Sequence, residues 1–121
     1  MTQRPSIRVA INGYGVIGKR VADAVAKQDD MMLAGVADTV SDWRTRVALS
    51  KGFRLYGATK SHANAMHQAG MAISGTLDDL LDEADIVIDC TPKHVAGQNI
   101  ETYRQRGVMQ HNINRSHPDS P

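Results

Sequence analysis

The feature that most constrains this chain is a glycine-spaced turn placed directly after a short apolar run. Residues 7–11 read Ile-Arg-Val-Ala-Ile, and Gly13, Gly15 and Gly18 follow within the next seven positions. Residues 16–25 then repeat apolar side chains at a spacing that fits one face of a helix. A buried strand, a G-x-G-x-x-G turn and a helix in this order predict the first unit of a dinucleotide-binding domain.

Each glycine of the turn has a separate physical task in such a unit. Gly13 permits the tight turn out of the strand, Gly15 lets the backbone approach a pyrophosphate, and Gly18 allows close packing of helix on strand. The unpaired N–H groups at the helix start, assisted by the helix dipole, then bind phosphate oxygens. The alternative is a plain turn with three coincidental glycines.

An acidic residue stands at the expected distance from this turn. Asp38 follows the apolar run 31–37 and lies twenty positions after Gly18. A carboxylate there accepts hydrogen bonds from a ribose 2′-hydroxyl and repels a 2′-phosphate, so we expect NAD to be preferred over NADP. Two alternatives stay open: Asp38 is a solvated loop residue, or Arg44 and Arg46 turn inward and offset the repulsion.

The remainder of the chain alternates between strand and helix patterns. We expect strands at 31–37, 53–56, 71–73, 85–89 and from 108 to 110, and helices at 42–50, 76–84 and 95–106. Ser41 and Thr76 are candidate N-caps, and 61–70 is interpreted as a loop with one helical turn. The alternation predicts an α/β fold, a Rossmann-type doubly wound parallel sheet in one domain over 1–113, with 114–121 as a tail without fixed structure.

Composition narrows the classes of partner. The 121 residues carry a formal net charge of +1, so no strong field attracts nucleic acid or an anionic membrane, and neither is expected as a partner. A single cysteine permits no internal disulfide, and the first apolar run is too short for a signal sequence. We therefore expect a cytoplasmic protein. Self-association into a homo-oligomer is expected if the domain exposes apolar surface that a further domain would cover.

Candidates for chemistry are few. Cys90 follows the 85–89 strand and stands near His94, but a reactive thiol needs a lowered pKa, and unpaired cysteines are commonly inert core residues. Thr91 and Pro92 are expected to shape the wall beside the nicotinamide ribose, and Lys93 and His94 to be exposed loop residues. The five histidines form no known metal-binding pattern. No catalytic residue and no metal ligand is predicted.

Beyond the turn, the chain resembles the archaeal-type (type II) glyceraldehyde-3-phosphate dehydrogenases. The likeness runs from Ile7 to about Gln110. It is carried by 11–25 (Ile-Asn-Gly-Tyr-Gly-Val-Ile-Gly-Lys-Arg-Val-Ala-Asp-Ala-Val), 28–31, 51–53, 69–70, 75–77, 84–89 (Ala-Asp-Ile-Val-Ile-Asp), 91–93 (Thr-Pro-Lys) and 98–99. The resemblance implies NAD(P)-dependent, phosphorylating oxidation of glyceraldehyde 3-phosphate by a two-domain homotetramer. Its implied cofactor contacts, joined to those argued above, give the predicted site: Asn12, Gly13, Tyr14, Gly15, Val16, Ile17, Gly18, Asp38, Thr39, Thr91, Pro92 and Gln110.

The chain departs from this family in three respects. The Ser-Cys-Asn-Thr-Thr motif that carries the family's nucleophile is absent, so we expect the chain alone to be inactive. Many relatives have a lysine at the position of Asp38, and the family continues with Gln-Gly-Gly where this chain has Gln110 and His111. Two alternatives to a fragment of such an enzyme stay open. One is a stand-alone dinucleotide-binding module, and the other is the cofactor domain of another two-domain dehydrogenase, such as homoserine dehydrogenase or dihydrodipicolinate reductase.

Overall fold

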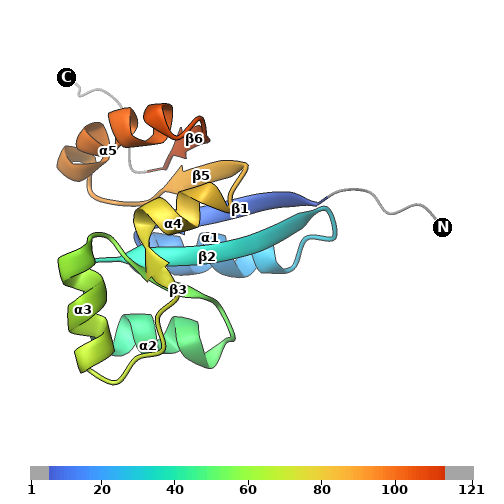
Figure 1. Cartoon of the computed structure of the whole chain (residues 1–121). Coiled ribbons are helices and arrows are strands. Elements are labelled where there is room, and N and C mark those ends of the chain that lie inside the picture. Colours follow the sequence, from blue (N-terminus) through green and yellow to red (C-terminus); the bar gives the residue numbers. More distant parts are fainter. Residues whose placement is uncertain (1–5, 114–121) are drawn as a thin grey trace.

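Strands and helices alternate along the whole of the described chain (Figure 1). A computed structural model describes residues 6–113, except for the side chain of His94, so the predicted tail 114–121 lies outside the described residues. The elements are β1 (Ile7–Asn12), α1 (Val16–Ala26), β2 (Met31–Asp38), α2 (Trp43–Ser50), β3 (Leu55–Gly57), α3 (Lys60–Gln68), β4 (Gly75–Thr76), α4 (Leu77–Asp82), β5 (Ile86–Asp89), α5 (Lys93–Gln105) and β6 (Met109–Asn112).

The six strands form one sheet in the order β4-β3-β2-β1-β5-β6, and every neighbouring pair is parallel. The chain moves outward from β1 to β4 and then returns to place β5 on the other side of β1. The predicted α/β, Rossmann-type parallel sheet is confirmed. In such sheets ligands bind beyond the carboxyl ends of the strands where the order reverses, which here means the ends of β1 and β5.

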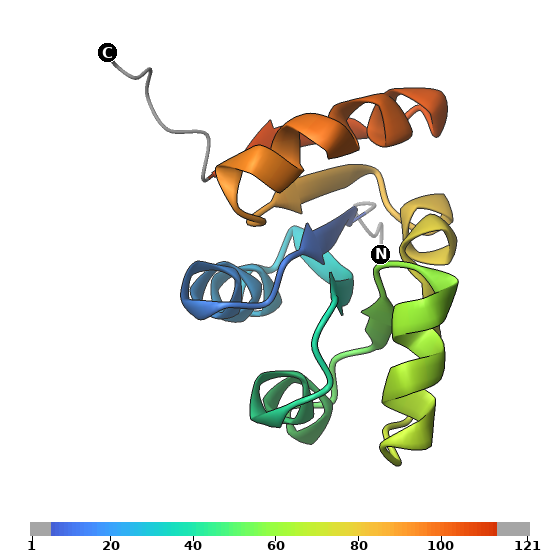
Figure 2. The ribbon, with the colours of Figure 1, turned by 90° about the vertical axis from the view of Figure 1, so that its left-hand side faces the viewer.

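Helices cover both faces of the sheet (Figure 2). Side chains of each strand alternate between two buried clusters: Val9 and Ile11 face α1 and α2, whereas Ala10 of the same strand faces α4 and α5. This period of two is what a strand buried on both sides requires. No helix within residues 6–113 combines the length and apolar character needed to cross a membrane.

Two local predictions are wrong. Residues 71–73 form no strand: Met71 is buried as part of a loop, and the edge strand β4 comes later, at Gly75–Thr76. The stretch predicted as a loop with one turn is the helix α3, whose buried side is only Ala63 and Met66. Six of its nine residues are polar, so the stretch resembles a loop in composition.

Helix boundaries also differ in places, for reasons visible in the caps. Asp42, not Ser41, caps α2, because its carboxylate accepts from the N–H of Arg44 at 3.0 Å. Thr76 caps α4 as predicted, within a capping box closed by Asp79. Helix α5 begins two residues before the predicted start, and β6 continues past Gln110 to Asn112.

Candidate functional site

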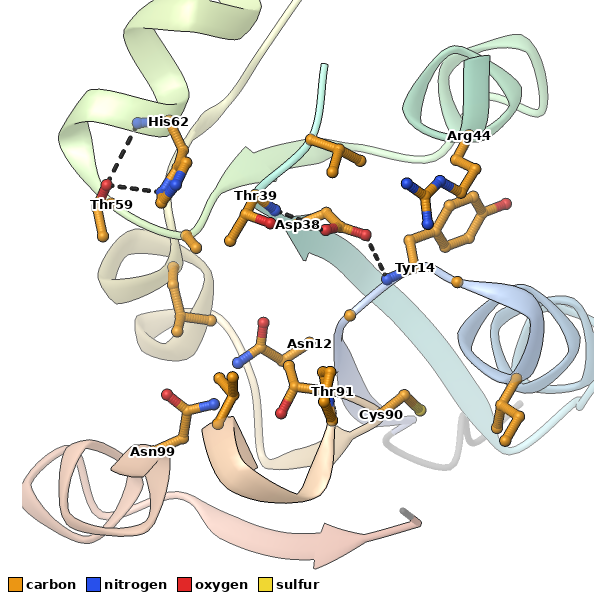
Figure 3. A pocket seen from close by; sticks show the side chains of 18 of the residues that line it. Asn12, Tyr14, Asp38, Thr39, Arg44, Thr59, His62, Cys90, Thr91 and Asn99 are labelled. Carbon is orange, nitrogen blue, oxygen red and sulfur yellow. Dashed lines mark hydrogen bonds between the residues drawn. The ribbon is translucent and has the colours of Figure 1, made fainter. Parts of the chain in front are cut away.

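A cavity of about 710 Å³ opens at the carboxyl ends of β1, β2 and β5. It is lined by Asn12, Gly13, Tyr14, Gly15, Val16, Ile17, Asp38, Thr39, Val40, Arg44, Ala58, Thr59, His62, Leu77, Cys90, Thr91, Pro92, Val95, Gln98 and Asn99. Ten of the twelve predicted site residues are among them. Figure 3 shows Asn12, Thr91 and Asn99 gathered on one side of this cavity and Asp38, Thr39 and Arg44 on the other.

Gly18 and Gln110 lie outside the lining. A Cβ on Gly18 would stand 1.9 Å from the carbonyl oxygen of Gly13, so this glycine lets α1 pack against the turn. Gln110 lies on β6, where it pairs with Val87 of β5. The structure does not bring Gln110 into the cavity, and its contact with a cofactor stays a prediction.

Gly13 and Gly15, although only two residues apart, are constrained differently. Gly13 has φ +99°, and a Cβ there would meet the backbone of Cys90 and Thr91 at 2.9 Å. Gly15 has φ −86°, which any residue can adopt, and a Cβ there would meet no protein atom within 4 Å. The fold therefore explains Gly13 but not Gly15.

The start of α1 faces the cavity with its polar backbone. Gly15 is the N-cap, no side chain among the described residues caps the helix, and its first turn contains no acidic residue. The first residues of the helix, Val16 and Ile17, line the cavity. Uncapped N–H groups at the positive end of a helix dipole form an anion site, and a diphosphate fits it.

Asp38 has a second task that the sequence did not reveal. Its Oδ2 accepts from the N–H of Tyr14 at 2.7 Å, and its Oδ1 accepts from the N–H of Thr39 at 2.6 Å. The carboxylate thus holds the glycine turn against the end of β2. Each carboxylate oxygen retains acceptor capacity beyond one hydrogen bond, which leaves room for ribose hydroxyls.

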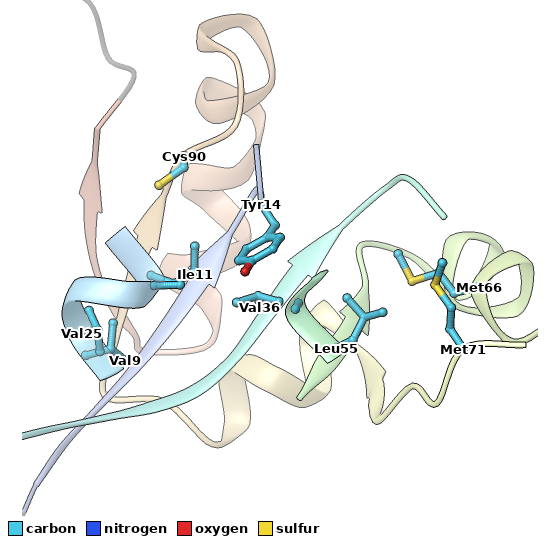
Figure 4. Close-up of a cluster of buried hydrophobic side chains, with 11 residues drawn as sticks. Val9, Ile11, Tyr14, Val25, Val36, Leu55, Met66, Met71 and Cys90 are labelled. Atoms are coloured by element: carbon cyan, nitrogen blue, oxygen red, sulfur yellow. The ribbon is translucent and has the colours of Figure 1, made fainter. Parts of the chain in front are cut away.

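The Tyr14 side chain belongs to the core rather than to the cavity's polar surface. Figure 4 shows its ring among Ile11 and Val36, and the side chain is fully buried. Its hydroxyl has no hydrogen-bond partner in the described structure, and burial raises the pKa of this phenol. Tyr14 therefore meets a ligand through its backbone.

Polar groups at the far end of the cavity come from α2 and α3. The guanidinium of Arg44 pairs with Asp42 at 3.1 Å, and this hydrogen bond is the main reason that the pKa of Arg44 is raised. The hydroxyl of Thr59, which caps α3, lies 2.8 Å from Nδ1 of His62. Sequence reasoning missed Thr59 and His62, because nothing in their spacing links them to the glycine turn.

The opposite end is built on a buried carboxylate. Asp89, the last residue of β5, is fully buried, and its Oδ1 accepts from the N–H of Thr91 at 2.8 Å and from the Thr91 hydroxyl. Its Oδ2 accepts from Asn99 Nδ2 at 3.1 Å and from the Tyr103 hydroxyl. Asn99 and Tyr103 are four residues apart and share one face of α5. This spacing places both side chains toward Asp89 only because α5 packs beside β5, so the sequence alone did not reveal the network.

Cys90 is not set up for nucleophilic chemistry. Its side chain is buried, and burial, assisted by the neighbouring charge of Asp89, raises the pKa of the thiol to about 12. A nucleophilic cysteine needs the opposite shift. Lys93 and His94, expected in a loop, are the first two residues of α5, and the side chain of His94 lies outside the described part of the structure.

Residues 7–110 match the family model described as dihydrodipicolinate reductase, N-terminus. The chain belongs to this family. The match begins with β1 and ends within β6, so it includes all or part of every strand of the sheet that carries the cavity.

Individual relatives refine the comparison. The chain is 52% identical over 100 residues to the glyceraldehyde-3-phosphate dehydrogenase of Methanothermus fervidus and 53% identical over 102 residues to that of Methanothermobacter thermautotrophicus. These matches cover 83% and 84% of this chain but only 30% of each relative. The predicted resemblance to the archaeal enzymes is confirmed, and the chain corresponds to an N-terminal, dinucleotide-binding part of such a protein. An unrelated stand-alone module is not favoured.

Solved structures support the fold. The UDP-N-acetylglucosamine 3-dehydrogenase GnnA of Acidithiobacillus ferrooxidans aligns over 90% of this chain and 30% of its own, with a TM-score of 0.66 and 24% identity. GenD2 from gentamicin A biosynthesis, solved in complex with NAD, aligns over 93% of this chain with a TM-score of 0.57 and 20% identity. At these identities the likeness concerns the arrangement of strands and helices.

Proposed function

We propose that this domain binds NAD in the cavity at the ends of β1, β2 and β5, as the cofactor half of a phosphorylating glyceraldehyde-3-phosphate dehydrogenase. The diphosphate would lie on the amides at the start of α1, the adenosine toward Asp38 and the nicotinamide toward Thr91. One observation supports the proposal most strongly: residue 15 is a glycine, although the surrounding protein atoms leave room for a side chain.

The argument from Gly15 is one of elimination. Gly13 is required by a positive φ and Gly18 by a clash with backbone, but Gly15 is required by neither. A Cβ at Gly15 would stand in open space, and Gly15 is one of the residues that line the cavity. The absent methyl group is therefore explained by a ligand that approaches the backbone closely, as a dinucleotide pyrophosphate does at such turns.

NAD is favoured over NADP by the charge around the ribose position. The Asp38 carboxylate is fixed by two backbone N–H groups, so it cannot easily turn away from a 2′-phosphate. Arg44 is the nearest candidate to offset that repulsion, but its guanidinium is engaged by Asp42. An arginine held by another carboxylate is a weaker partner for phosphate.

The chemical step is assigned to a part of the protein outside this chain. The chain has no Ser-Cys-Asn-Thr-Thr motif, and the thiol of Cys90 is buried with a raised pKa. We therefore expect no turnover of glyceraldehyde 3-phosphate by these 121 residues alone. The cytoplasmic location and the formation of a homo-oligomer stay predictions from the sequence.

Calorimetric titration with NAD tests the proposal. The wild-type chain is expected to bind NAD, and Gly15→Ala is expected to weaken binding about a hundredfold, or about 2.7 kcal/mol, without loss of stability. Gly97→Ala is the matched control, since a Cβ there also meets no atom within 4 Å but Gly97 lies outside the cavity lining. Equal NAD affinity in wild type and Gly15→Ala would contradict the proposal.

A further inference from the structure

The carboxylate of Asp89 is fully removed from solvent. None of the ion pairs found among the side chains that the structure describes, which exclude that of His94, includes it. A buried charge is costly unless hydrogen bonds replace its hydration. Here four described donors do so, two on each oxygen, and they come from two different segments of the chain.

The donors come from the loop after β5 and from α5. Thr91 supplies its N–H and its hydroxyl to Oδ1, and α5 supplies Asn99 and Tyr103 to Oδ2. One side chain therefore fixes both the start of the loop that leads to α5 and the face of α5 that returns toward the sheet. Carboxylate is the side chain best suited to this, because it accepts at both oxygens and donates at neither.

The network also reaches the central strand. Asn12, the last residue of β1 and 97% buried, donates from Nδ2 to the Tyr103 hydroxyl at 2.8 Å. Asn12, Thr91 and Asn99 all line the cavity, whereas Tyr103 is fully buried outside the lining. Three cavity groups are thus held in one relative position by two buried residues, Asp89 and Tyr103.

We propose that Asp89, acting with Tyr103, is a positioning residue for the nicotinamide half of the cofactor. It sets the wall formed by Asn12, Thr91 and Asn99 and contacts no part of the cofactor itself. The inference rests on the proposed function, because it takes this side of the cavity as the nicotinamide side.

No hydrogen bond among the described residues links the network to the Asp38 side of the cavity. Asp38 holds the glycine turn through Tyr14 and Thr39, and none of these three residues is hydrogen-bonded to Asp89 or Tyr103. Loosening the network should therefore leave the site for adenosine and diphosphate in place. A residue that served only global stability would instead affect both halves alike.

Two variants and one control separate these outcomes. Tyr103→Phe removes one hydroxyl at a position that does not line the cavity, and Asp89→Asn leaves one oxygen to serve four donors. Tyr56→Phe is the control, since Tyr56 is buried in the same hydrophobic cluster but belongs to neither the network nor the lining. Affinities are measured for NADH, by its fluorescence, and for ADP, which lacks the nicotinamide riboside, by calorimetry. Thermal unfolding shows that each variant is folded.

For Tyr103→Phe we expect NADH affinity to fall about tenfold, equivalent to about 1.4 kcal/mol, while ADP affinity stays within about twofold. Asp89→Asn should show the same split more strongly, and Tyr56→Phe should change neither affinity. Equal losses for NADH and ADP, or no loss for NADH in a folded Tyr103→Phe, would overturn the inference. Failure of the wild-type chain to bind either compound would instead overturn the proposed function from which the inference starts.

Discussion

The two turns that border the cavity present different groups to it, one its backbone and the other its side chains. The β1–α1 turn presents backbone: Gly13 and Gly18 bring main chain into contact, and the uncapped amides at the start of α1 face the cavity. The β5–α5 turn presents side chains, which the buried carboxylate of Asp89 holds in place. The first turn suits an anion such as a diphosphate, and in the proposed site the second turn lies beside the nicotinamide half of the cofactor.

The two turns should therefore lose ligand binding in different ways on substitution. A site made of backbone amides depends on the absence of side chains, so adding one methyl group is enough to damage it. A side-chain site is specified by a set of partners, so removing one member weakens the remainder gradually.

The largest effect concerns the reactivity of Cys90. We expect the β5–α5 turn to hold the ligand in position and not to supply a nucleophile. The Cys90 thiol should then react with an aromatic disulfide reagent at pH 8 about a thousandfold more slowly than a free cysteine, because its pKa is raised to about 12. The rate is followed by the absorbance of the released thiolate. Full reactivity in the folded protein, with no increase on adding urea, would show that the turn holds an activated nucleophile.

The next effect is on the fold. Gly18→Ala places a methyl group 1.9 Å from the Gly13 carbonyl oxygen, and we expect the free energy of unfolding to fall by about 3 kcal/mol. Urea denaturation measures this, with Gly97→Ala as a control that should lose nothing. A Gly18→Ala variant as stable as wild type would mean that α1 does not depend on this close approach.

The same contrast explains how well each turn could be predicted from the sequence. Gly13 and Gly18 could be predicted, because a positive φ at Gly13 and a backbone contact at Gly18 allow only glycine. The network is not visible in this way. Asp89, Asn99 and Tyr103 are ordinary residues of a strand and a helix, and only the docking of α5 brings their polar atoms together.

The same reasoning explains the errors in the fold prediction. Helix α3 is short and six of its nine residues are polar, so its composition resembles a loop more than that of α1 does. The apolar residues 71–73 were expected to pair as a strand, but Met71 packs into the core from a loop that begins at Gly70, where φ is +84°. Burial of a side chain and pairing of its backbone are separate events, and apolar character predicts only the first.

A smaller effect is expected on cofactor choice. Asp38→Asn removes the charge that opposes a 2′-phosphate, and we expect the ratio of NAD affinity to NADP affinity to fall about tenfold. Asp30→Asn makes the same charge change at an exposed residue just before β2 and should leave the ratio unaltered. Competition titrations with the two cofactors give the ratio, and an unchanged ratio in Asp38→Asn would remove Asp38 as its cause.

The smallest effect lies away from both turns, where Arg8 of β1 pairs with Asp85 beside β5 at 3.1 Å. Hydrogen bonds from Arg8 lower the pKa of the Asp85 carboxyl in the folded protein. The pair therefore stabilises the fold above the ordinary pKa of an aspartate, and this contribution is lost as pH falls through the lowered value.

Both groups of this pair are exposed to solvent, so the contribution should be small and sensitive to salt. Urea denaturation at pH 7 and pH 3 should show wild type losing slightly more stability on acidification than Asp85→Asn. Asp29→Asn, for which no ion pair is found within residues 6–113, should behave as wild type. Equal losses in wild type and Asp85→Asn would show that the pair contributes nothing.

The most direct test of the central claim is to observe the amides of the β1–α1 turn while cofactor is added. In an ¹⁵N-labelled sample titrated with NAD, the backbone N–H signals of Gly15, Val16 and Ile17 should shift most, and those of the loop 69–73, which does not line the cavity, should hardly move. If these three signals stay in place while NAD binds, the diphosphate does not lie on this turn, and the proposed site is wrong.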